Sequence, residues 1–305
     1  PLQSRWYTLP NGLTVVMSVN KAEPRVQTLI ATKAGSKNDP AENTGLAHYL
    51  EHLLFKGTDK YGTLDYAKEK VYLDQIDALY ETYNKTKDEA KRKTIYRQID
   101  SVSGLAAKYA IANEYDKMMQ VLGASGTNAF TSFEQTVYVN DLPSNQMSSW
   151  LTVEAERFRN PVLRLFHTEL EAVYEEKNIS LDNDSRKASE AMLASLFRNH
   201  NYGLQTTIGT VEHLKNPSIQ KIRDYYNTNY VPNNMAIILA GDIDPDKLII
   251  EISEKFSYMK RAEVQPYVFK PEMPRANPDK IEITGPDAEF LQFGYRIPGG
   301  AGTQE

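Results

Sequence analysis

The sequence predicts an α+β fold in which helices pack on a β-sheet. One observation is a hairpin signal near the start of the chain, where Asn11-Gly12 separates two short runs rich in β-forming residues. A second is the helical spacing of apolar residues between 64 and 122. A third is the aliphatic run at 235–241, which is typical of a buried strand. Strands and long helices are therefore expected to share one core.

The elements can be predicted in order along the chain. We expect strands on both sides of the hairpin turn and at three later places, at 5–9, 13–19, 26–34, 128–140 and 235–241. We expect helices where apolar residues recur at three- and four-residue spacing, at 45–55, 64–122, 144–159, 168–197, 218–227 and 245–256. In the first helix, Asn43 or Thr44 can act as N-cap and Gly57 can end it. A charged run at 86–93 divides the longest stretch into two helices.

The chain is expected to contain more than one domain. A proline-rich stretch marks a linker at 263–279, after a first domain over residues 1–262. Two β-rich segments follow, at 280–283 and 290–295, and predict the start of a second domain. We expect this second domain, over 280–305, to be truncated, because so few residues cannot fold alone.

The composition is that of an ordinary globular protein and excludes several classes of function. Of the 305 residues, 41% are apolar and 25% are charged. The formal net charge of −5, without a long basic run, argues against nucleic-acid binding. No apolar stretch reaches the roughly 18 residues that a membrane-spanning helix needs. Because the chain has no cysteine, disulfide scaffolds, thiolate metal sites and cysteine nucleophiles are excluded.

The segment from Gly45 to Thr58 contains the pattern His-x-x-Glu-His. On a helix, His48 and His52 are four residues apart and point to one face, a spacing that suits two nitrogen ligands of Zn²⁺. Glu51 lies at the edge of the same face, where it can reach a metal-bound water without being a ligand. The remaining side of the helix is apolar and would pack into the core. The pattern predicts a catalytic zinc site.

A catalytic zinc site usually has three protein ligands, so a third must come from elsewhere. The other histidines are scattered and have no ligand-like partners in the sequence: His167, His200 and His213. The acidic segment 168–178 is a better source, but spacing alone does not choose among Glu169, Glu171, Glu175 and Glu176. Glu169 and Glu176 are two helical turns apart and share a face. One of them could bind zinc while the other orients a histidine.

Several blocks of the sequence are similar to the pitrilysin/insulysin family of inverzincins, which includes the mitochondrial processing peptidases. Besides the zinc motif, these blocks are Leu9–Leu13, Asn128–Ser132, Ile208–Leu214, Tyr230–Met235 and Ala240–Pro245. The resemblance extends over residues 6–256. It implies a metallopeptidase-half fold of the pitrilysin type, with a sheet and helices packed on it.

The resemblance also implies the third ligand. In the family this ligand is the last glutamate of an acid-rich helix, three residues after a valine, which here is Val173. The ligand therefore falls on Glu176, and the family's supporting acid, seven residues earlier, falls on Glu169. One zinc ion per chain would be held by His48, His52 and Glu176.

The implied activity is that of a zinc metalloendopeptidase that hydrolyses peptides or unfolded polypeptide segments. Glu51 would be the base that takes a proton from the zinc-bound water. The peptide substrate would lie as an added strand beside Asn128, Ala129 and Phe130. The rival interpretations are a non-catalytic, zinc-containing peptide-binding or scaffold subunit and a purely structural zinc domain. The intact Glu51 favours the enzyme, because neither rival needs it.

Two departures from the family are expected to matter. The distance from His52 to Glu176 is longer than is usual, and the extra residues, at about 63–115, predict an inserted helical hairpin. We expect this hairpin to contact a partner or to be decoration rather than to be a lid. Active family members also need a second homologous half, on the same chain or on a partner subunit, which we expect to be missing here. Bacterial members are often exported, so the periplasm or cell envelope is the expected location.

Overall fold

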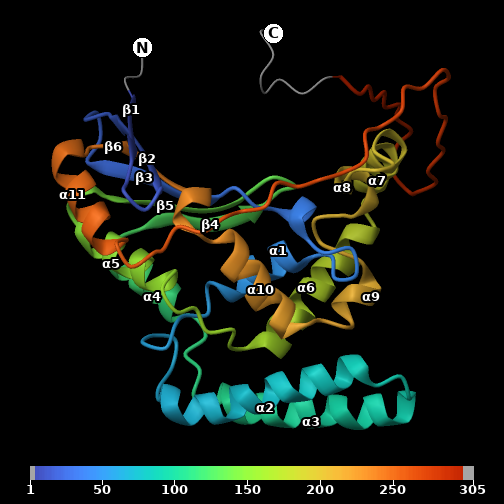
Figure 1. The fold of residues 1–305 in the computed structure, drawn as a ribbon, viewed down its shortest axis with the longest axis horizontal. Coiled ribbons are helices and arrows are strands. Elements are labelled where there is room, and N and C mark those ends of the chain that lie inside the picture. The colour runs from blue at the N-terminus through green and yellow to red at the C-terminus, as the bar shows by residue number, and fades with distance from the viewer. Residues whose placement is uncertain (1–3, 298–305) are drawn as a thin grey trace.

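The computed structural model describes residues 4–297 and is built around one six-stranded sheet (Figure 1). The strands are, in chain order, β1 Ser4–Thr8, β2 Thr14–Val19, β3 Arg25–Thr32, β4 Ser125–Thr131, β5 Thr136–Pro143 and β6 Met235–Gly241. Their order across the sheet is β1-β2-β6-β3-β5-β4. Neighbouring strands are antiparallel except β2 and β6, which are parallel. The sheet is therefore mixed, with β1 and β4 at its edges.

The last strand in the chain lies in the middle of the sheet. β1 and β2 form the expected hairpin, and Gly12 in its turn has a φ of +93° that favours glycine. β6 lies between β2 and β3, so that Ile238 is opposite both Val16 and Leu29. Segments more than 200 residues apart in the chain are thus held in one sheet by backbone hydrogen bonds on both sides of β6.

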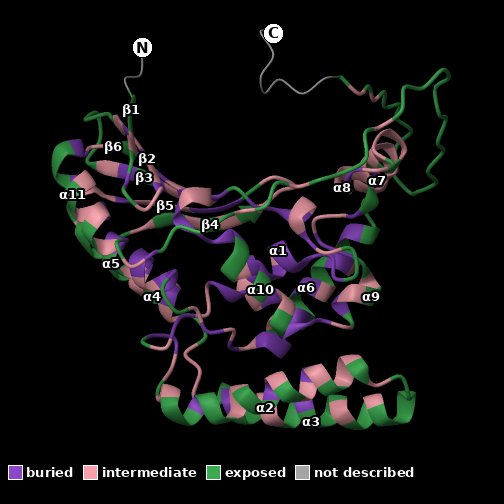
Figure 2. Cartoon of the chain, viewed as in Figure 1, coloured by how far each residue is buried: buried purple, intermediate pink, exposed green. Residues whose placement is uncertain are grey.

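Helices lie on one face of this sheet and bury the core between them and the strands (Figures 1 and 2). They are α1 Leu46–Leu53, α2 Tyr66–Lys85, α3 Glu89–Ala107, α4 Glu114–Val121, α5 Met147–Arg157, α6 Phe166–Leu181, α7 Asp184–Leu196, α8 Asn201–Leu204, α9 Val211–Leu214, α10 Ile219–Asn229 and α11 Pro245–Lys255. Of these, α7 and α8 lie beyond one end of the sheet (Figure 1). Helices α2 and α3 pair as a hairpin that projects below the other helices in Figure 1. The expected α+β class with an inserted helical hairpin is confirmed.

The sheet face turned away from the helices has a row of partly exposed side chains. Strand alternation places every second residue on this face, while its neighbours point into the core. The register aligns one residue from each strand in this row: Trp6, Val16, Ile238, Leu29, Val139 and Asn128. Trp6 is 71% exposed at the β1 end of the row.

Two segments that the sequence predicts as single elements are divided in the structure. The strand expected at 128–140 is a hairpin of β4 and β5, turned by Ser132, whose Oγ accepts from the backbone N–H of Gln135. The turn contains no Gly, Pro, Asn or Asp that would have signalled it. The helix expected at 168–197 is divided into α6 and α7 because Asn183 caps α7 by accepting from the backbone N–H of Arg186 at 2.8 Å.

The long helical stretch expected at 64–122 is also divided, into α2, α3 and α4. The charged run at 86–93 forms the turn between α2 and α3 and the start of α3, where Asp88 caps the helix through the backbone N–H of Lys91. Residues 108–113 then lead into α4 without a regular helix. None of the helices in residues 4–297 combines the length and the apolar character that a membrane-spanning helix needs.

The strands expected at 280–283 and 290–295 are not formed. Described residues from 260 onward are neither helix nor strand, and they extend along α7 and α8 (Figure 1). They are held by hydrogen bonds that involve side chains. Arg198 donates to the carboxylate of Asp279 at 2.8 Å, and the backbone N–H of Asp287 donates to the carboxylate of Asp184 at 3.0 Å. A strand requires a partner edge for its backbone groups, and these residues do not pair with either edge of the sheet.

Candidate metal centre

Helix α1 carries the His-x-x-Glu-His pattern and begins at a specialised N-terminus. Gly45 has a φ of +89°, and a Cβ there would lie 2.7 Å from the carbonyl oxygen of Ile208. The buried Asp39 carboxyl accepts from the backbone N–H groups of Gly45 and Ala47, at 2.7 and 2.9 Å. These bonds satisfy donors that a helix start leaves free, and so fix where the helix begins.

Helix α6 carries the acidic residues and packs directly on α1. The two helices are joined where α6 begins, because the hydroxyl of Tyr49 donates to the carbonyl oxygen of Phe166. Glu169 and Glu176, two turns apart, both face α1, as their spacing predicts. Of the four glutamates that spacing left open, Glu169 and Glu176 are thus the two that face the histidines of α1.

The three expected ligands lie together. His48, His52 and Glu176 each offer a ligand atom, and these atoms lie within 4.8 Å of one another. His48 Nε2 is 3.5 Å from Glu176 Oε2, and His52 Nε2 is 3.7 Å from Glu176 Oε1. Donors at typical zinc bond lengths of about 2.0–2.1 Å lie about 3.4 Å apart at the corners of a tetrahedron. The donor set and its spacing therefore fit a zinc ion with a fourth position left open.

His48 is held in the neutral form that a metal ligand needs. Burial lowers its pKa to about 4, and the nearby charges of His52 and Arg186 act in the same direction. Its ring lies nearly perpendicular to that of His52, with centroids 4.8 Å apart. Its Nε2 is the nitrogen that faces Glu176.

Glu169 lies behind His52 and is not one of the three expected ligands. Glu169 Oε2 is 3.5 Å from His52 Nδ1, and Oε1 is 2.8 Å from Lys56 Nζ. Burial alone would lower the pKa of His52, but Glu169 and Glu176 outweigh it and raise that pKa. Burial alone would likewise raise the pKa of Glu169, but His52 and Lys56 outweigh it and lower that pKa. Glu169 is thus an ionised group that can orient the imidazole.

Glu51 is buried on the same helix and has a partner that the sequence did not suggest. Its side chain accepts a hydrogen bond of 2.6 Å from the hydroxyl of Thr131 on β4. Burial raises the pKa of Glu51, while the bond from Thr131 opposes that rise. Thr131 lies in the Asn128–Ser132 block, and its role depends on a contact between residues 80 positions apart.

The expected substrate-side residues lie on β4, the edge strand next to Glu51. Asn128 and Phe130 point to the sheet face away from the helices, and Phe130 is 46% exposed. Ala129 points to the opposite face, where it packs against the core and shares a side of the strand with Thr131. The outer edge of β4 has no partner strand within residues 4–297.

The other candidates are used elsewhere. Glu171 approaches His167 at 3.9 Å, and Glu175 accepts from Asn178 at 3.4 Å. His213 Nδ1 accepts from the backbone N–H of Thr44, and His200 Nδ1 caps the short helix α8. None of these five residues joins the cluster of His48, His52 and Glu176.

Comparison with known families finds two matching models. The model described as insulinase (peptidase family M16) matches residues 14–73 and 103–210. The model described as peptidase M16 inactive domain matches residues 218–305. The unmatched residues between the two parts of the first model, 74–102, fall within the α2–α3 hairpin.

Individual relatives are distant. A protein named zinc protease PqqE from Helicobacter pylori is 25% identical over 303 residues, which cover 95% of this chain and 56% of that protein. The beta subunit of the mitochondrial-processing peptidase of Dictyostelium discoideum is 22% identical, over 84% of this chain and 44% of that protein. A crystal structure of a protease from Helicobacter pylori has the same fold, with a TM-score of 0.63 at 23% identity, over 87% of this chain and 52% of that one. The chain spans about half the length of these relatives.

Proposed function

The chain belongs to the insulinase family of M16 peptidases, and on that premise we propose that it is the metal-binding half of a zinc-dependent endopeptidase. Its substrates would be peptides or unfolded polypeptide segments. The observation that carries this proposal is the placement of a buried carboxylate, Glu51, beside the cluster of His48, His52 and Glu176. A binding module or a structural metal site has no use for such a carboxylate.

The proposed roles follow from the contacts of each residue. His48, His52 and Glu176 would hold one zinc ion, which when bound supplies a water of lowered pKa and polarises the scissile carbonyl. Glu51 would take a proton from that water and pass it to the leaving amine. The raised pKa of Glu51 favours this transfer. Glu169 holds the ring of His52.

We propose that substrate adds to the sheet as an extended strand. The unpaired outer edge of β4 offers backbone donors and acceptors. Thr131, on the same strand, donates a hydrogen bond to Glu51. A peptide aligned on this edge would bring a scissile bond close to the base. Asn128 and Phe130, which point to the open sheet face, would contact substrate side chains, and Ala129 would allow close approach of the backbone.

We further propose that cleavage needs a second homologous half. The matched relatives are about twice as long as this chain, and one of them is named as the beta subunit of a peptidase. Residues 1–262 would form the metal-binding domain, and residues from 263 onward would lead toward the other half. That half could lie on the same polypeptide or on a partner chain.

Metal content and peptide cleavage, measured with and without the second half, test the proposal. We expect one zinc ion per chain, lost in His48→Ala and in Glu176→Gln but kept in Glu175→Gln, the matched control on the same helix. We expect cleavage only with the second half present, and Glu51→Gln should abolish it while keeping zinc. Zinc without cleavage in either form would favour a peptide-binding or scaffold subunit. A folded chain without zinc would refute the metal site.

A further inference from the structure

Arg164 is a fully buried cation whose five N–H groups all have acceptors. It precedes α6 and forms a bidentate pair with Glu69 of α2, with Nε to Oε1 at 2.8 Å and Nη2 to Oε2 at 2.9 Å. Both side chains are 0% exposed. The remaining N–H groups donate to the carbonyl oxygens of Lys56, Tyr61 and Thr58, at 2.8, 3.2 and 2.8 Å. Only arginine offers this many donors in a fixed plane.

The three carbonyl acceptors belong to the loop that directly follows α1. That loop must fold around the guanidinium, and its two glycines make the room for it. Gly57 and Gly62 have φ values of +99° and +83°, and a Cβ on either would lie within 3.0 Å of Arg164 Nη1. Arg164 therefore fixes the path of the chain where the metal-binding helix ends.

A continuous series of contacts runs from the helical hairpin to a metal ligand. Glu69 holds Arg164, and Arg164 holds the carbonyl oxygen of Lys56. The ammonium group of Lys56 is paired with Glu169 at 2.8 Å, and Glu169 lies 3.5 Å from Nδ1 of His52. Each link is shorter than 4 Å, and its first three members are largely or fully shielded from water.

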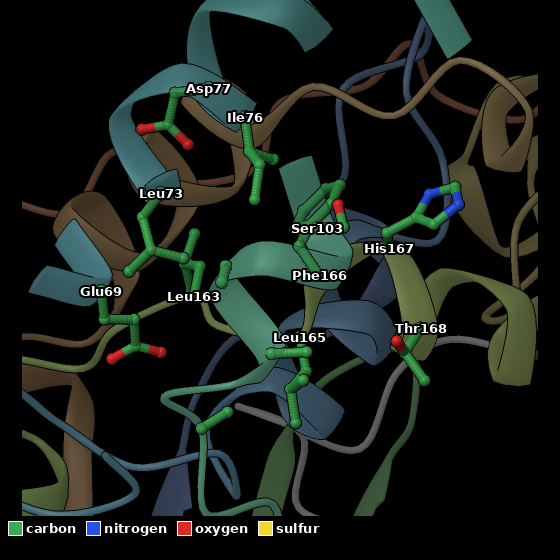
Figure 3. Close-up of a pocket in the computed structure, with 13 residues that line it drawn as sticks. Glu69, Leu73, Ile76, Asp77, Ser103, Leu163, Leu165, Phe166, His167 and Thr168 are labelled. Carbon is green, nitrogen blue, oxygen red and sulfur yellow. The ribbon is translucent and has the colours of Figure 1, made fainter. Parts of the chain in front are cut away.

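The hairpin also contacts the start of α6, the helix of Glu169 and Glu176. The hydroxyl of Tyr80 on α2 lies 2.9 Å from Nδ1 of His167. Leu165, which links Arg164 to the first residue of α6, has a φ of +54°, the only positive φ outside glycine among residues 4–297. Figure 3 shows the residues that line a cavity at this junction, with Glu69 on one side and His167 and Thr168 on the other; its volume is about 20 Å³.

We propose that Glu69 and Arg164 are positioning residues for the metal centre, so that the α2–α3 hairpin is part of its support. The pair sets the end of α1 and the start of α6 relative to each other, and Lys56 transmits that geometry to Glu169 and His52. This inference deepens the proposed function and depends on it. It differs from the expectation that the hairpin is decoration or a partner surface.

Three variants interrupt the series at different points. Glu69→Gln removes the charge that faces Arg164, and Glu69→Met with Arg164→Met replaces the whole pair by apolar side chains of similar size without leaving a charge unpaired. Lys56→Met removes the ammonium group that pairs with Glu169 and keeps an unbranched apolar side chain in the same largely shielded place. Asp74→Asn is the control, because Asp74 lies on α2 in an exposed pair with Lys70.

The measurements are the zinc dissociation constant by chelator competition, the visible spectrum of the Co²⁺-substituted chain, and the thermal midpoint without metal. We expect each folded variant of the series to bind zinc about tenfold more weakly and to change the Co²⁺ bands, while Asp74→Asn changes neither. The Met–Met variant also takes the donors from three loop carbonyl oxygens, so its thermal midpoint should fall. Changed Co²⁺ bands in the folded, metal-loaded variant, rather than lost stability, therefore distinguish positioning from a merely structural role.

Wild-type zinc affinity and Co²⁺ bands in any folded member of the series would overturn the inference. If Glu69→Gln does not fold, the Met–Met and Lys56→Met variants decide. A wild-type chain that binds no zinc would instead refute the proposed function, so the two failures can be told apart.

Discussion

At the scale of single residues, the protonation of Glu51 depends on two opposing contacts. Burial raises its pKa, and the hydrogen bond from Thr131 opposes that rise. A general base must be ionised to accept a proton, yet it must bind the proton well enough to hold it. Thr131 would therefore influence the pH at which Glu51 acts as the proposed base, although it would not touch the metal.

Replacing Thr131 by valine tests this role, because valine keeps the shape and removes the donor. The pKa of Glu51 should rise further, so the acid limb of the kcat/KM profile should move to higher pH, by about one unit. Activity well above that limb should change little, and Thr131→Ser should restore the wild-type profile. The measurement is a pH profile of peptide cleavage with the second half present. An unshifted acid limb would show that the hydrogen bond does not influence the base.

The part of the site that could be predicted from sequence is the part that is local in the chain. His48, Glu51 and His52 lie on one turn of helix, so their geometry follows from helical periodicity. Glu176 could not be separated from three neighbouring glutamates without the resemblance, because that choice depends on which face of α6 meets α1. Thr131 and Arg164 could not be predicted, because each acts through residues that are distant in sequence.

At the scale of elements, the start of α1 depends on the buried Asp39. Burial raises the pKa of Asp39 from 3.8 to about 8, despite the N–H bonds that it accepts. Because the folded pKa lies above the unfolded one, the contribution of Asp39 to stability is complete below about pH 4. It is lost as the pH rises through about 8.

The pH dependence of unfolding without metal tests this contribution. Between pH 5 and pH 9 the free energy of unfolding should fall more for the wild-type chain than for Asp39→Asn, whose side chain does not titrate. Urea denaturation at several pH values gives both curves, and Asp74→Asn, on an exposed helix face, is the control. Parallel curves for wild type and Asp39→Asn would contradict the assignment.

The loop after α1 and the helix α3 offer a matched pair of glycine substitutions. Gly57→Ala should destabilise the chain by about 2 kcal/mol or more, because a Cβ would meet the carbonyl of Tyr61 at 2.4 Å at a positive φ. Gly104→Ala should stabilise it by about 0.5–1 kcal/mol, since Gly104 lies within α3 with open space around it. Denaturant midpoints measure both, and equal effects would contradict the argument.

Element boundaries could be predicted where a turn residue marked them. Asn11-Gly12 identified the first hairpin, and the charged run at 86–93 identified the α2–α3 turn. The boundary between α6 and α7 was marked by Asn183, a residue that commonly caps helices, but the helical pattern continued on both sides of it. The turn at Ser132 carried only a weak signal, because its one turn-forming residue is a serine, which acts through its hydroxyl and its backbone N–H.

At the scale of the whole molecule, the boundary between the two matching family models is not a boundary of the fold. The models meet between residues 210 and 218, yet β6, which follows, pairs with β2 and β3 in the sheet centre. The order of strands could not be predicted from sequence, because it depends on pairings between residues more than 200 positions apart. The α+β class needed only the local patterns.

Truncation tests this description. A chain that ends at residue 262 should fold and bind zinc, because it keeps the sheet and α11. A chain that ends at 217 should not unfold cooperatively, because β2 and β3 would each lose the strand between them. Circular dichroism during heating distinguishes the two. A cooperative transition in the shorter chain would show that the sheet tolerates the loss of its centre.

The late arrival of β6 has a consequence for how the protein is made. Strand β2 leaves the ribosome before its parallel neighbour β6, which follows more than 200 residues later, or roughly ten to forty seconds at usual rates of synthesis. During that interval two strand edges that will be buried are free to pair with other chains. The nascent polypeptide is therefore expected to depend on chaperones until Met235–Gly241 has emerged.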